Sequence, residues 1–358
     1  MFINQMFELS MVMDKEKFEK VLRNQYNVSS YGENEKKYID QSLASDGITV
    51  IYRNSQYKKK VRIIVNSRLL LGADKIDSDK IIRKLDKYVS RYFDSEYRLD
   101  DFTLSGMTLV TDIGVRNREN VASYLKVLHR VGRVKGFSPI YFDCFDDNTS
   151  FCLDGNSNGI QFLIYDLESL LRSQIGRTDV GRKKLKAIAA ETQGVLRAEV
   201  RLMKPKAIRN YTDEIDITGQ IVELSKNCKD IFMDTFTHII PFGDYLKKDK
   251  AVEIIHREVK DCIMRRKMLH LLELIPEKKS LYLAQKSLNC RNIEKIMEAF
   301  AKVNVAPVTI SKRQDTRYLK NIYFVLVNNC VGFSLSPFYG TQKVIAYDYP
   351  MKCEVIIT

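Results

Sequence analysis

Hydrophobic positions along the first two thirds of the chain switch between a period of two and a period near 3.6. Residues 48–66 hold two short β-branched runs, ITVIY and VRIIVN, around the polar, basic segment RNSQYKKK, which predicts a hairpin. Residues 77–93 follow with Ile81, Leu85 and Val89 at helical spacing, and we place the N-cap at Ser78 or Asp79. FTLSGMTLVTDIGV then returns to the pattern of a strand, and NRENVASYLKVLHRV to that of a helix.

The middle of the chain continues this mixture of strands and helices. FSPIYFDCFDDNTSFCLDGNSNGIQFLIY predicts an antiparallel meander, because DDNT and DGNSNG are rich in turn-forming residues. A helix over residues 166–190 and the strand VLRAEVRLM follow. The order of these elements indicates an α+β domain, in which an antiparallel sheet carries helices on one face.

The pattern changes near Pro241. Short successive helices rich in Lys and Arg are predicted from about residue 244 to 302, and we interpret them as a basic, winged-helix-like helical module. IYFVLVNN, KVIAYDYP and CEVIIT predict strands after it. The sequence therefore predicts an N-terminal segment (1–50), a sheet-based domain (51–235) and a helical module with C-terminal strands (236–358).

Charge and cysteine usage narrow the functional classes. The 358 residues include 58 basic and 45 acidic ones, a net charge of +13, which favours a polyanionic partner and nucleic acid first. Seven cysteines and four histidines are scattered without a CxxC or His-x-His pair, so zinc-ligand spacing is absent. Neither a signal peptide nor the run of about 20 apolar residues needed to span a bilayer is present, so we expect a cytoplasmic protein that does not use a membrane.

Four segments occur in a fixed order within about residues 60–210: VRIIVNSRLLLG, LSGMTLVTDIGV, NGIQFLIYDLESLLR and LRAEVRLMK. In order and rough spacing they resemble the histidine-poor replication initiation factor family, the rolling-circle initiators and relaxase-like proteins of plasmids, phages and conjugative elements. The last two segments are the most specific ones. The resemblance covers under half of the chain and implies a nicking-type sheet domain.

The resemblance implies a role for five residues. Tyr165 corresponds to the nucleophile, and a tyrosine that attacks a DNA phosphodiester forms a covalent link that makes strand cleavage reversible. Asp112 and Glu199 correspond to acids that hold Mg²⁺ or Mn²⁺, which prefer carboxylate oxygens. Arg197 and Arg201 share a strand face with Glu199 and are suited to hold phosphate.

Two positions depart from the pattern of the family. Ile64 and Thr108 stand where the family has acids, so the metal site is incomplete unless other acids substitute. The nearby candidates for that substitution are Asp143, Asp146 and Asp154. Tyr211, after the acid-bearing strand, is a second possible nucleophile, and Tyr165 has the alternative role of a packing residue at the end of its strand.

Basic residues gather at two further places that suit phosphate contacts. The candidate DNA-binding residues outside the strand face are Lys58, Lys59 and Lys60 in the first hairpin, and Lys312, Arg313, Arg317 and Lys320 near the end of the helical module. Tyr318 lies among the second group, and a mixture of basic and aromatic residues is typical of nucleic-acid surfaces. The alternative for both groups is a solvated surface that only keeps the protein soluble.

These observations lead to two hypotheses. The first is a replication initiator of a mobile element that binds double-stranded origin DNA, receives a single strand and nicks it with Tyr165; by resemblance it acts as a homodimer with a host helicase in a bacterial cytoplasm. The second is a non-catalytic DNA-binding protein that keeps the fold of the initiators without a complete metal site. Ile64 and Thr108 favour the second hypothesis.

Overall fold

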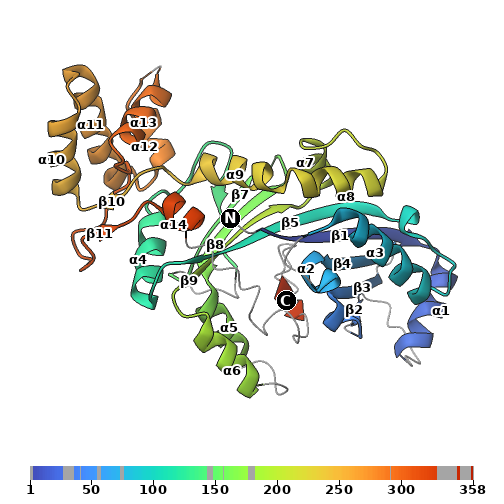
Figure 1. Cartoon of the computed structure of the whole chain (residues 1–358). Coiled ribbons are helices and arrows are strands. Elements are labelled where there is room, and N and C mark those ends of the chain that lie inside the picture. The colour runs from blue at the N-terminus through green and yellow to red at the C-terminus, as the bar shows by residue number, and fades with distance from the viewer. Residues whose placement is uncertain are drawn as a thin grey trace. The chain divides into compact units, whose positions relative to one another are not determined.

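The protein is an α+β protein built on a nine-stranded antiparallel sheet (Figure 1). The computed structural model describes residues 3–26, 36–40, 42–54, 58–72, 76–142, 148–155, 157–175, 182–290, 292–328, 345–346 and 356–357. Within that part of the chain it contains fourteen α-helices. No helix there combines the length and the apolar composition that crossing a bilayer requires.

The strands of the sheet come from the first 202 residues. In chain order they are β1 (Asn4–Met13), β2 (Lys36–Asp40), β3 (Ile48–Asn54), β4 (Lys59–Asn66), β5 (Thr103–Gly114), β6 (Ser138–Pro139), β7 (Ser150–Gly155), β8 (Ile160–Asp166) and β9 (Val195–Leu202). Across the sheet the order is β2-β3-β4-β1-β5-β9-β8-β7-β6. The predicted β3–β4 hairpin and the β6–β7–β8 meander are confirmed.

β1 lies in the segment to which the sequence assigned no element. It pairs with β4 on one side and with β5 on the other, so it lies inside the sheet rather than before it. Phe7 and Leu9 point to one face and are fully buried, while Met6, Glu8 and Ser10 alternate with them. The N-terminal segment therefore supplies an interior strand.

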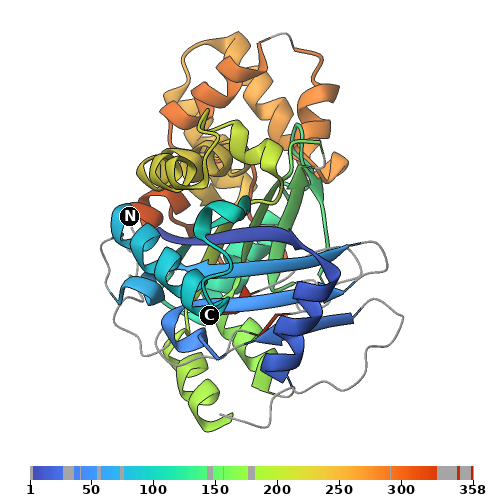
Figure 2. The ribbon, with the colours of Figure 1, turned by 90° about the vertical axis from the view of Figure 1, so that its right-hand side faces the viewer.

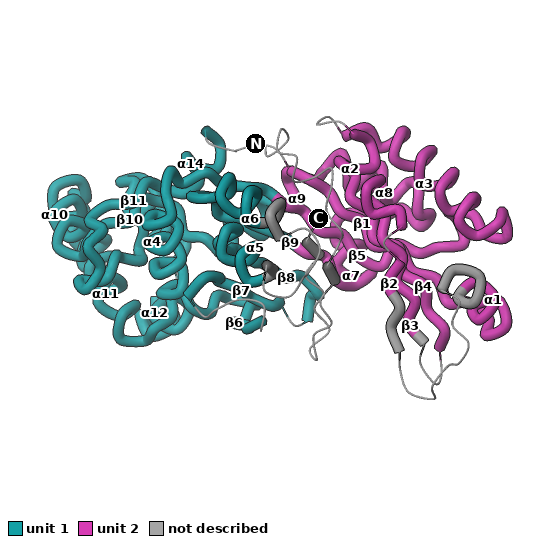
Figure 3. The backbone as a smooth tube through the Cα atoms, turned by 90° about the horizontal axis from the view of Figure 1, so that it is seen from below, with its two compact units in different colours: residues 1–2, 111–200, 232–333 teal, residues 3–110, 201–231, 334–358 magenta. Residues whose placement is uncertain are grey.

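The chain forms two compact units (Figure 3). Unit 1 contains residues 1–2, 111–200 and 232–333, and unit 2 contains residues 3–110, 201–231 and 334–358. The division falls within β5 and β9, so each unit holds part of both strands. The domain boundaries at residues 50 and 235 stay predictions.

In unit 2, helices cover the apolar face of β3 and β4. Its helices are α1 (Lys15–Tyr26), α2 (Ser67–Leu71), α3 (Ser78–Tyr92), α7 (Pro205–Arg209) and α8 (Ile217–Lys226). Leu85 and Val89 of α3 line a small void together with Val50 and Ile63 of the strands. The N-cap of α3 is Asp77, whose carboxylate accepts a hydrogen bond from the Lys80 amide, so the prediction of Ser78 or Asp79 was wrong by one or two residues.

In unit 1, two helices pack on the apolar face of β7 and β8. Phe236 of α9 (Cys228–Ile239) lies 5.9 Å from Phe162, and His129, at the end of α4 (Arg118–Leu128), lies 5.9 Å from Phe151, measured between ring centroids. The helix predicted over residues 166–190 is two helices, α5 (Leu167–Ile175) and α6 (Arg182–Glu191).

The helical module after Pro241 is confirmed as a group of helices, visible in orange in Figure 2. These helices are α10 (Lys248–Glu258), α11 (Cys262–Lys278), α12 (Leu281–Ser287) and α13 (Ile293–Lys302). A short pair of strands, β10 (Tyr245–Leu246) and β11 (Tyr318–Leu319), joins the start of the module to the segment after it. Its winged-helix character stays a prediction.

The segment IYFVLVNN is a helix, so its prediction as a strand was wrong. α14 (Ile322–Asn328) buries Ile322, Tyr323, Val325 and Leu326, which is helical spacing, and a short apolar run does not separate the two cases. The Asn321 side chain accepts a hydrogen bond from the Tyr323 amide and helps to start the helix. Of the two later segments predicted as strands, the structure describes only β12 (Ile345–Ala346) and β13 (Ile356–Ile357).

Candidate functional site

An ion pair joins β5 to β9 in unit 1. Arg197 donates from Nε to Oδ1 of Asp112 over 2.7 Å and from Nη2 to Oδ2 over 3.0 Å. This two-point geometry matches a planar guanidinium to a planar carboxylate and is among the strongest hydrogen-bonded pairs in proteins. Both side chains are about 4% exposed or less, so the pair lies in a region of low dielectric.

A second polar contact joins β9 to β8. The hydroxyl of Tyr165 donates to Oε1 of Glu199 over 2.5 Å, and both residues are buried. Tyr165 is the penultimate residue of β8, close to the strand end at which the sequence predicted it. A hydroxyl that donates to a carboxylate at this distance is a strong, charge-assisted hydrogen bond.

The two contacts lie on one face of the sheet. Arg197 and Glu199 are two residues apart on β9, so their side chains point to the same side. Asp112 meets this face from β5 and Tyr165 meets it from β8, the two strands that flank β9 (Figure 1). The structure therefore brings together four of the residues that the resemblance singled out.

The arrangement is closed to a macromolecular substrate. The Tyr165 side chain is 1% exposed, whereas a nucleophile that attacks DNA has to meet a phosphodiester. All residues of β8 and β9 are buried. The role of nucleophile requires an exposed phenol, whereas this phenol is enclosed and donates to Glu199.

The donor set around Asp112 and Glu199 does not fit Mg²⁺ or Mn²⁺ in this arrangement. Both oxygens of Asp112 accept from Arg197, and Oε1 of Glu199 accepts from Tyr165, whereas a hard cation takes about six oxygen ligands. Among the described residues no group of three or more acids, histidines or cysteines is arranged to hold a metal ion. The closed arrangement does not form the metal site that the resemblance implies, and a site in an opened arrangement stays a prediction.

The two positions that depart from the family pattern have apolar surroundings in the structure. Ile64 is buried in a cluster with Met6, Ile51 and Val110. Thr108 is half-buried and lies opposite Met6. Of the acids proposed as substitutes, Asp154 is half-buried on β7, and Asp143 and Asp146 lie outside the described residues.

One acid on the sheet was missed by the sequence analysis. Glu8 of β1 accepts from Nε of Arg62 over 2.9 Å and from Oγ of Ser105 over 2.9 Å, all within unit 2. In the register of the sheet Glu8 lies opposite Ile64 on one side and Gly106 on the other. The period-two pattern in FELSM contains the signal that would have identified both the strand and its acid.

The remaining predicted residues differ in how far solvent reaches them. Arg201, on the same face of β9 as Glu199, is buried, and Tyr211 is half-buried in the turn after α7. Lys58 is exposed, while Lys59 and Lys60 are half-buried at the start of β4. Burial and the neighbouring charge of Arg62 lower the pKa of Lys60 from its ordinary value.

The basic residues near the end of the helical module are the accessible ones. Lys312, Arg313, Arg317 and Lys320 are all exposed, and none of them forms an ion pair with another described residue. Tyr318 in their midst is exposed as well. Unpaired cations on a surface can neutralise phosphates without first breaking contacts inside the protein.

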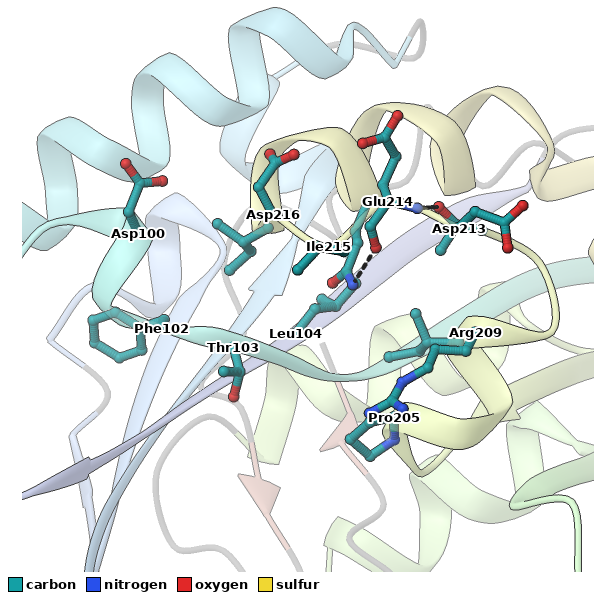
Figure 4. A pocket seen from close by; sticks show the side chains of 14 residues that line it. Asp100, Phe102, Thr103, Leu104, Pro205, Arg209, Asp213, Glu214, Ile215 and Asp216 are labelled. Carbon is teal, nitrogen blue, oxygen red and sulfur yellow. Dashed lines mark hydrogen bonds between the residues drawn. The ribbon is translucent and has the colours of Figure 1, made fainter.

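Unit 2 contains a cavity of the opposite charge (Figure 4). It measures about 680 Å³, and Asp100, Asp213, Glu214 and Asp216 line it together with one cation, Arg209. Such a surplus of carboxylates repels phosphate. The cavity is therefore unfavourable for a phosphate group.

Comparisons with protein-family models, with curated proteins and with solved structures found no match to this chain.

Proposed function

We propose that the protein is a rolling-circle-type replication initiator that binds DNA and cleaves one strand with Tyr165. The observation that carries the proposal is the shared sheet face of Asp112, Arg197, Glu199 and Tyr165, the four residues to which the resemblance in sequence gives a role. The net charge of +13 and the exposed cations near residue 320 support a nucleic-acid substrate.

The Tyr165–Glu199 contact suggests how the phenol would be activated. Glu199 accepts the hydrogen bond of the hydroxyl, so it is placed to take the proton as the tyrosine oxygen attacks phosphorus. The bond between the tyrosine oxygen and phosphorus forms while the bond from phosphorus to the 3′ oxygen breaks. The 3′ oxygen leaves as a hydroxyl by taking a proton from water, to which Glu199 returns the proton that it accepted from Tyr165. Rejoining is the reverse of these steps, with the phosphotyrosyl bond conserving the energy of the phosphodiester.

The ion pair between Arg197 and Asp112 suggests how DNA would open the site. A phosphodiester presents two anionic oxygens in a geometry close to that of a carboxylate, so it can replace Asp112 on the fork of Arg197. The exchange keeps the guanidinium paired with an anion and frees the Asp112 carboxylate, which has to be solvated as this face opens. In this proposal the closed face is the resting form, and the DNA strand itself opens it.

A second candidate function is DNA binding without cleavage. The enclosed Tyr165 and the lack of a third acid among the described neighbours favour it. A buried network of this kind also serves to fix the register of strands, because each polar group requires its own partner. The same experiment separates the two functions.

The experiment is a cleavage assay on a supercoiled plasmid that carries the DNA flanking the coding sequence, with Mg²⁺, with Mn²⁺ and with a chelator. The first proposal expects a nicked plasmid with protein bound covalently to the 5′ end, and loss of that adduct in Tyr165→Phe but not in Tyr211→Phe. The chelator arm reports directly whether a divalent ion is needed.

Two results would contradict nicking by Tyr165. An adduct that persists in Tyr165→Phe assigns the nucleophile elsewhere, to Tyr211 if the second variant loses it. Plasmid binding with no adduct under any of the three conditions supports the non-catalytic function. Thermal unfolding of each variant verifies that the loss of adduct is not a loss of fold.

A further inference from the structure

A cleft in unit 1 lies where β5 ends and α4 begins, beside the segment 318–325. Its volume is about 400 Å³, within the range of roughly 300–1,000 Å³ that is usual for small-ligand sites. The residues that line it are Gly114, Val115, Arg116, Asn120, Tyr124, Tyr318, Leu319, Lys320 and Val325. They combine aromatic rings with cations and include no acid.

Tyr318 forms a fixed aromatic wall of this cleft. Its side chain is 52% exposed, although β11, on which it lies, pairs with β10 through Leu246. Its hydroxyl donates to Oδ2 of Asp244 over 3.3 Å, which orients the ring. That carboxylate also accepts from the side chain of Asn304 and the amide of Asn321, so its charge is engaged inside the protein.

Two cations line the same cleft as this ring. Lys320 is exposed, and its backbone carbonyl accepts a 2.7 Å hydrogen bond from the Tyr124 hydroxyl. Ser123 and Thr316 hydrogen-bond over 2.7 Å and fix the same segment to α4 a second time. Arg116 is exposed. Burial raises the pKa of Tyr124, and the charge of Arg116 lowers it, so the arginine acts on the tyrosine beside it in the cleft.

The backbone of Arg116 is strained. Its φ is +78°, a left-handed conformation that non-glycine residues rarely adopt and that functional sites often contain. A backbone hydrogen bond fixes the turn at Arg116, because the Val115 amide donates to the Gly194 carbonyl over 2.8 Å. A side chain on Gly194 would meet the carbonyl of Arg116 at 2.9 Å, so this close approach requires glycine.

We propose that this cleft binds one unpaired nucleotide of single-stranded DNA, with its base stacked on Tyr318 and its phosphate held by Arg116 and Lys320. The inference rests on the proposed function, which supplies DNA as the substrate. An exposed ring beside exposed cations is the combination that single-strand binding uses, since every base has a face that can stack. A duplex keeps its bases stacked on one another and offers no such face to the cleft.

The test is fluorescence anisotropy with a labelled oligothymidine and with a labelled duplex of the same length, using the full chain. Tyr318→Ala is expected to weaken single-strand binding roughly 5- to 150-fold and to leave duplex binding within twofold. Tyr318→Phe keeps the stacking face and is expected to bind nearly as the unaltered protein does.

Arg116→Gly removes the cation and relieves the backbone at the same position, so a folding defect is not expected. The slope of log affinity against log salt for the single strand should fall by about 0.7, the value for one phosphate contact. Arg266→Ala on α11, which also removes an exposed arginine, is the matched control and should leave the slope unchanged.

The outcomes separate the cleft from the function on which it rests. If Tyr318→Ala and Arg116→Gly leave single-strand binding unchanged, the proposal that this cleft binds a nucleotide is wrong. A Tyr165-dependent adduct would still support the initiator function in that case. Equal losses on single strand and duplex overturn the assignment to an unpaired nucleotide. Failure of the unaltered protein to bind either DNA overturns both proposals.

Discussion

Among the described residues, each unit contains an arginine that faces a carboxylate across antiparallel strands, and the two pairs differ greatly in exposure to solvent. In unit 1 the side chains of Arg197 and Asp112 are 4% and 3% exposed. In unit 2 those of Arg62 and Glu8 are 13% and 23% exposed, and Ser105 also donates to Glu8. Only the first pair includes a residue of β9, the strand next to the one that carries the candidate nucleophile.

The difference shows what burial adds to an ion pair. Removing one partner from a dry pair leaves a charge without water to solvate it, while a pair that solvent reaches is partly rescued. We therefore expect each member of the Arg197–Asp112 pair to keep a partner of opposite charge, either its present one or another ion that replaces it. This is the property that the proposed exchange of Asp112 for a phosphodiester uses.

The largest expected effect is the loss of one member of the buried pair. Asp112→Ala or Arg197→Ala should lower the free energy of unfolding by about 3–5 kcal/mol, because either leaves its partner's charge buried without this contact. Urea denaturation measures the effect.

The double variant Asp112→Leu with Arg197→Met is the control, since it removes both charges and keeps apolar volume. It should be far less destabilised than either single variant. Additive losses in the double variant would mean that the two residues are not coupled, which contradicts the comparison.

The second effect concerns the contact that borders the pair. Tyr165→Phe removes only the hydroxyl that donates to Glu199, and hydrogen bonds to charged groups contribute about 1.5–3 kcal/mol to stability. Tyr52→Phe is a matched control, because the Tyr52 hydroxyl donates to the neutral Tyr92 hydroxyl over 3.0 Å. The control should cost about 1 kcal/mol. Equal costs in the two variants would show that the Tyr165–Glu199 contact contributes no more than an ordinary bond between two hydroxyls.

The third effect is the loss of the partly exposed pair. Arg62→Ala should cost about 1–2 kcal/mol, less than Arg197→Ala, because solvent and Ser105 continue to stabilise Glu8. Chemical denaturation at two salt concentrations tests it, since the smaller contribution should also be the more salt-sensitive one. A cost equal to that of Arg197→Ala would show that exposure does not govern these pairs.

The sequence predicted most strands of the sheet, but it did not predict the contacts and the burial of the site residues. Short runs rich in β-branched and other apolar residues identified β3, β4, β5, β8 and β9, because each is bounded by turn residues or by a helix with its own period. β1 was missed although its pattern is present. α14 was assigned as a strand because its few apolar residues fit both periods.

The partners within the site lay beyond the sequence for a physical reason. Strand alternation places Arg197 and Glu199 on one face, but which acid each residue contacts depends on the strand order and register. The burial of Tyr165 depends on tertiary packing over this face of the sheet, which a local sequence pattern does not contain. Similarly, the cleft of Arg116 and Tyr318 joins residues about two hundred positions apart, which no local pattern connects.

The smallest expected loss of stability comes from the most exposed of the three ion pairs compared. Lys20 and Glu96 of unit 2 form a 3.0 Å ion pair whose side chains are 63% and 38% exposed. Exposed pairs contribute about 0–1 kcal/mol, because water solvates both charges and salt screens them, so Lys20→Ala should cost no more than roughly 0.5 kcal/mol. Urea denaturation in low salt and in roughly 0.5 M salt, with Arg62→Ala and Arg197→Ala measured beside it, puts the three pairs on one scale. A cost for Lys20→Ala above that of Arg62→Ala would reverse the order in exposure and remove burial as the reason that the pair beside Tyr165 is distinct.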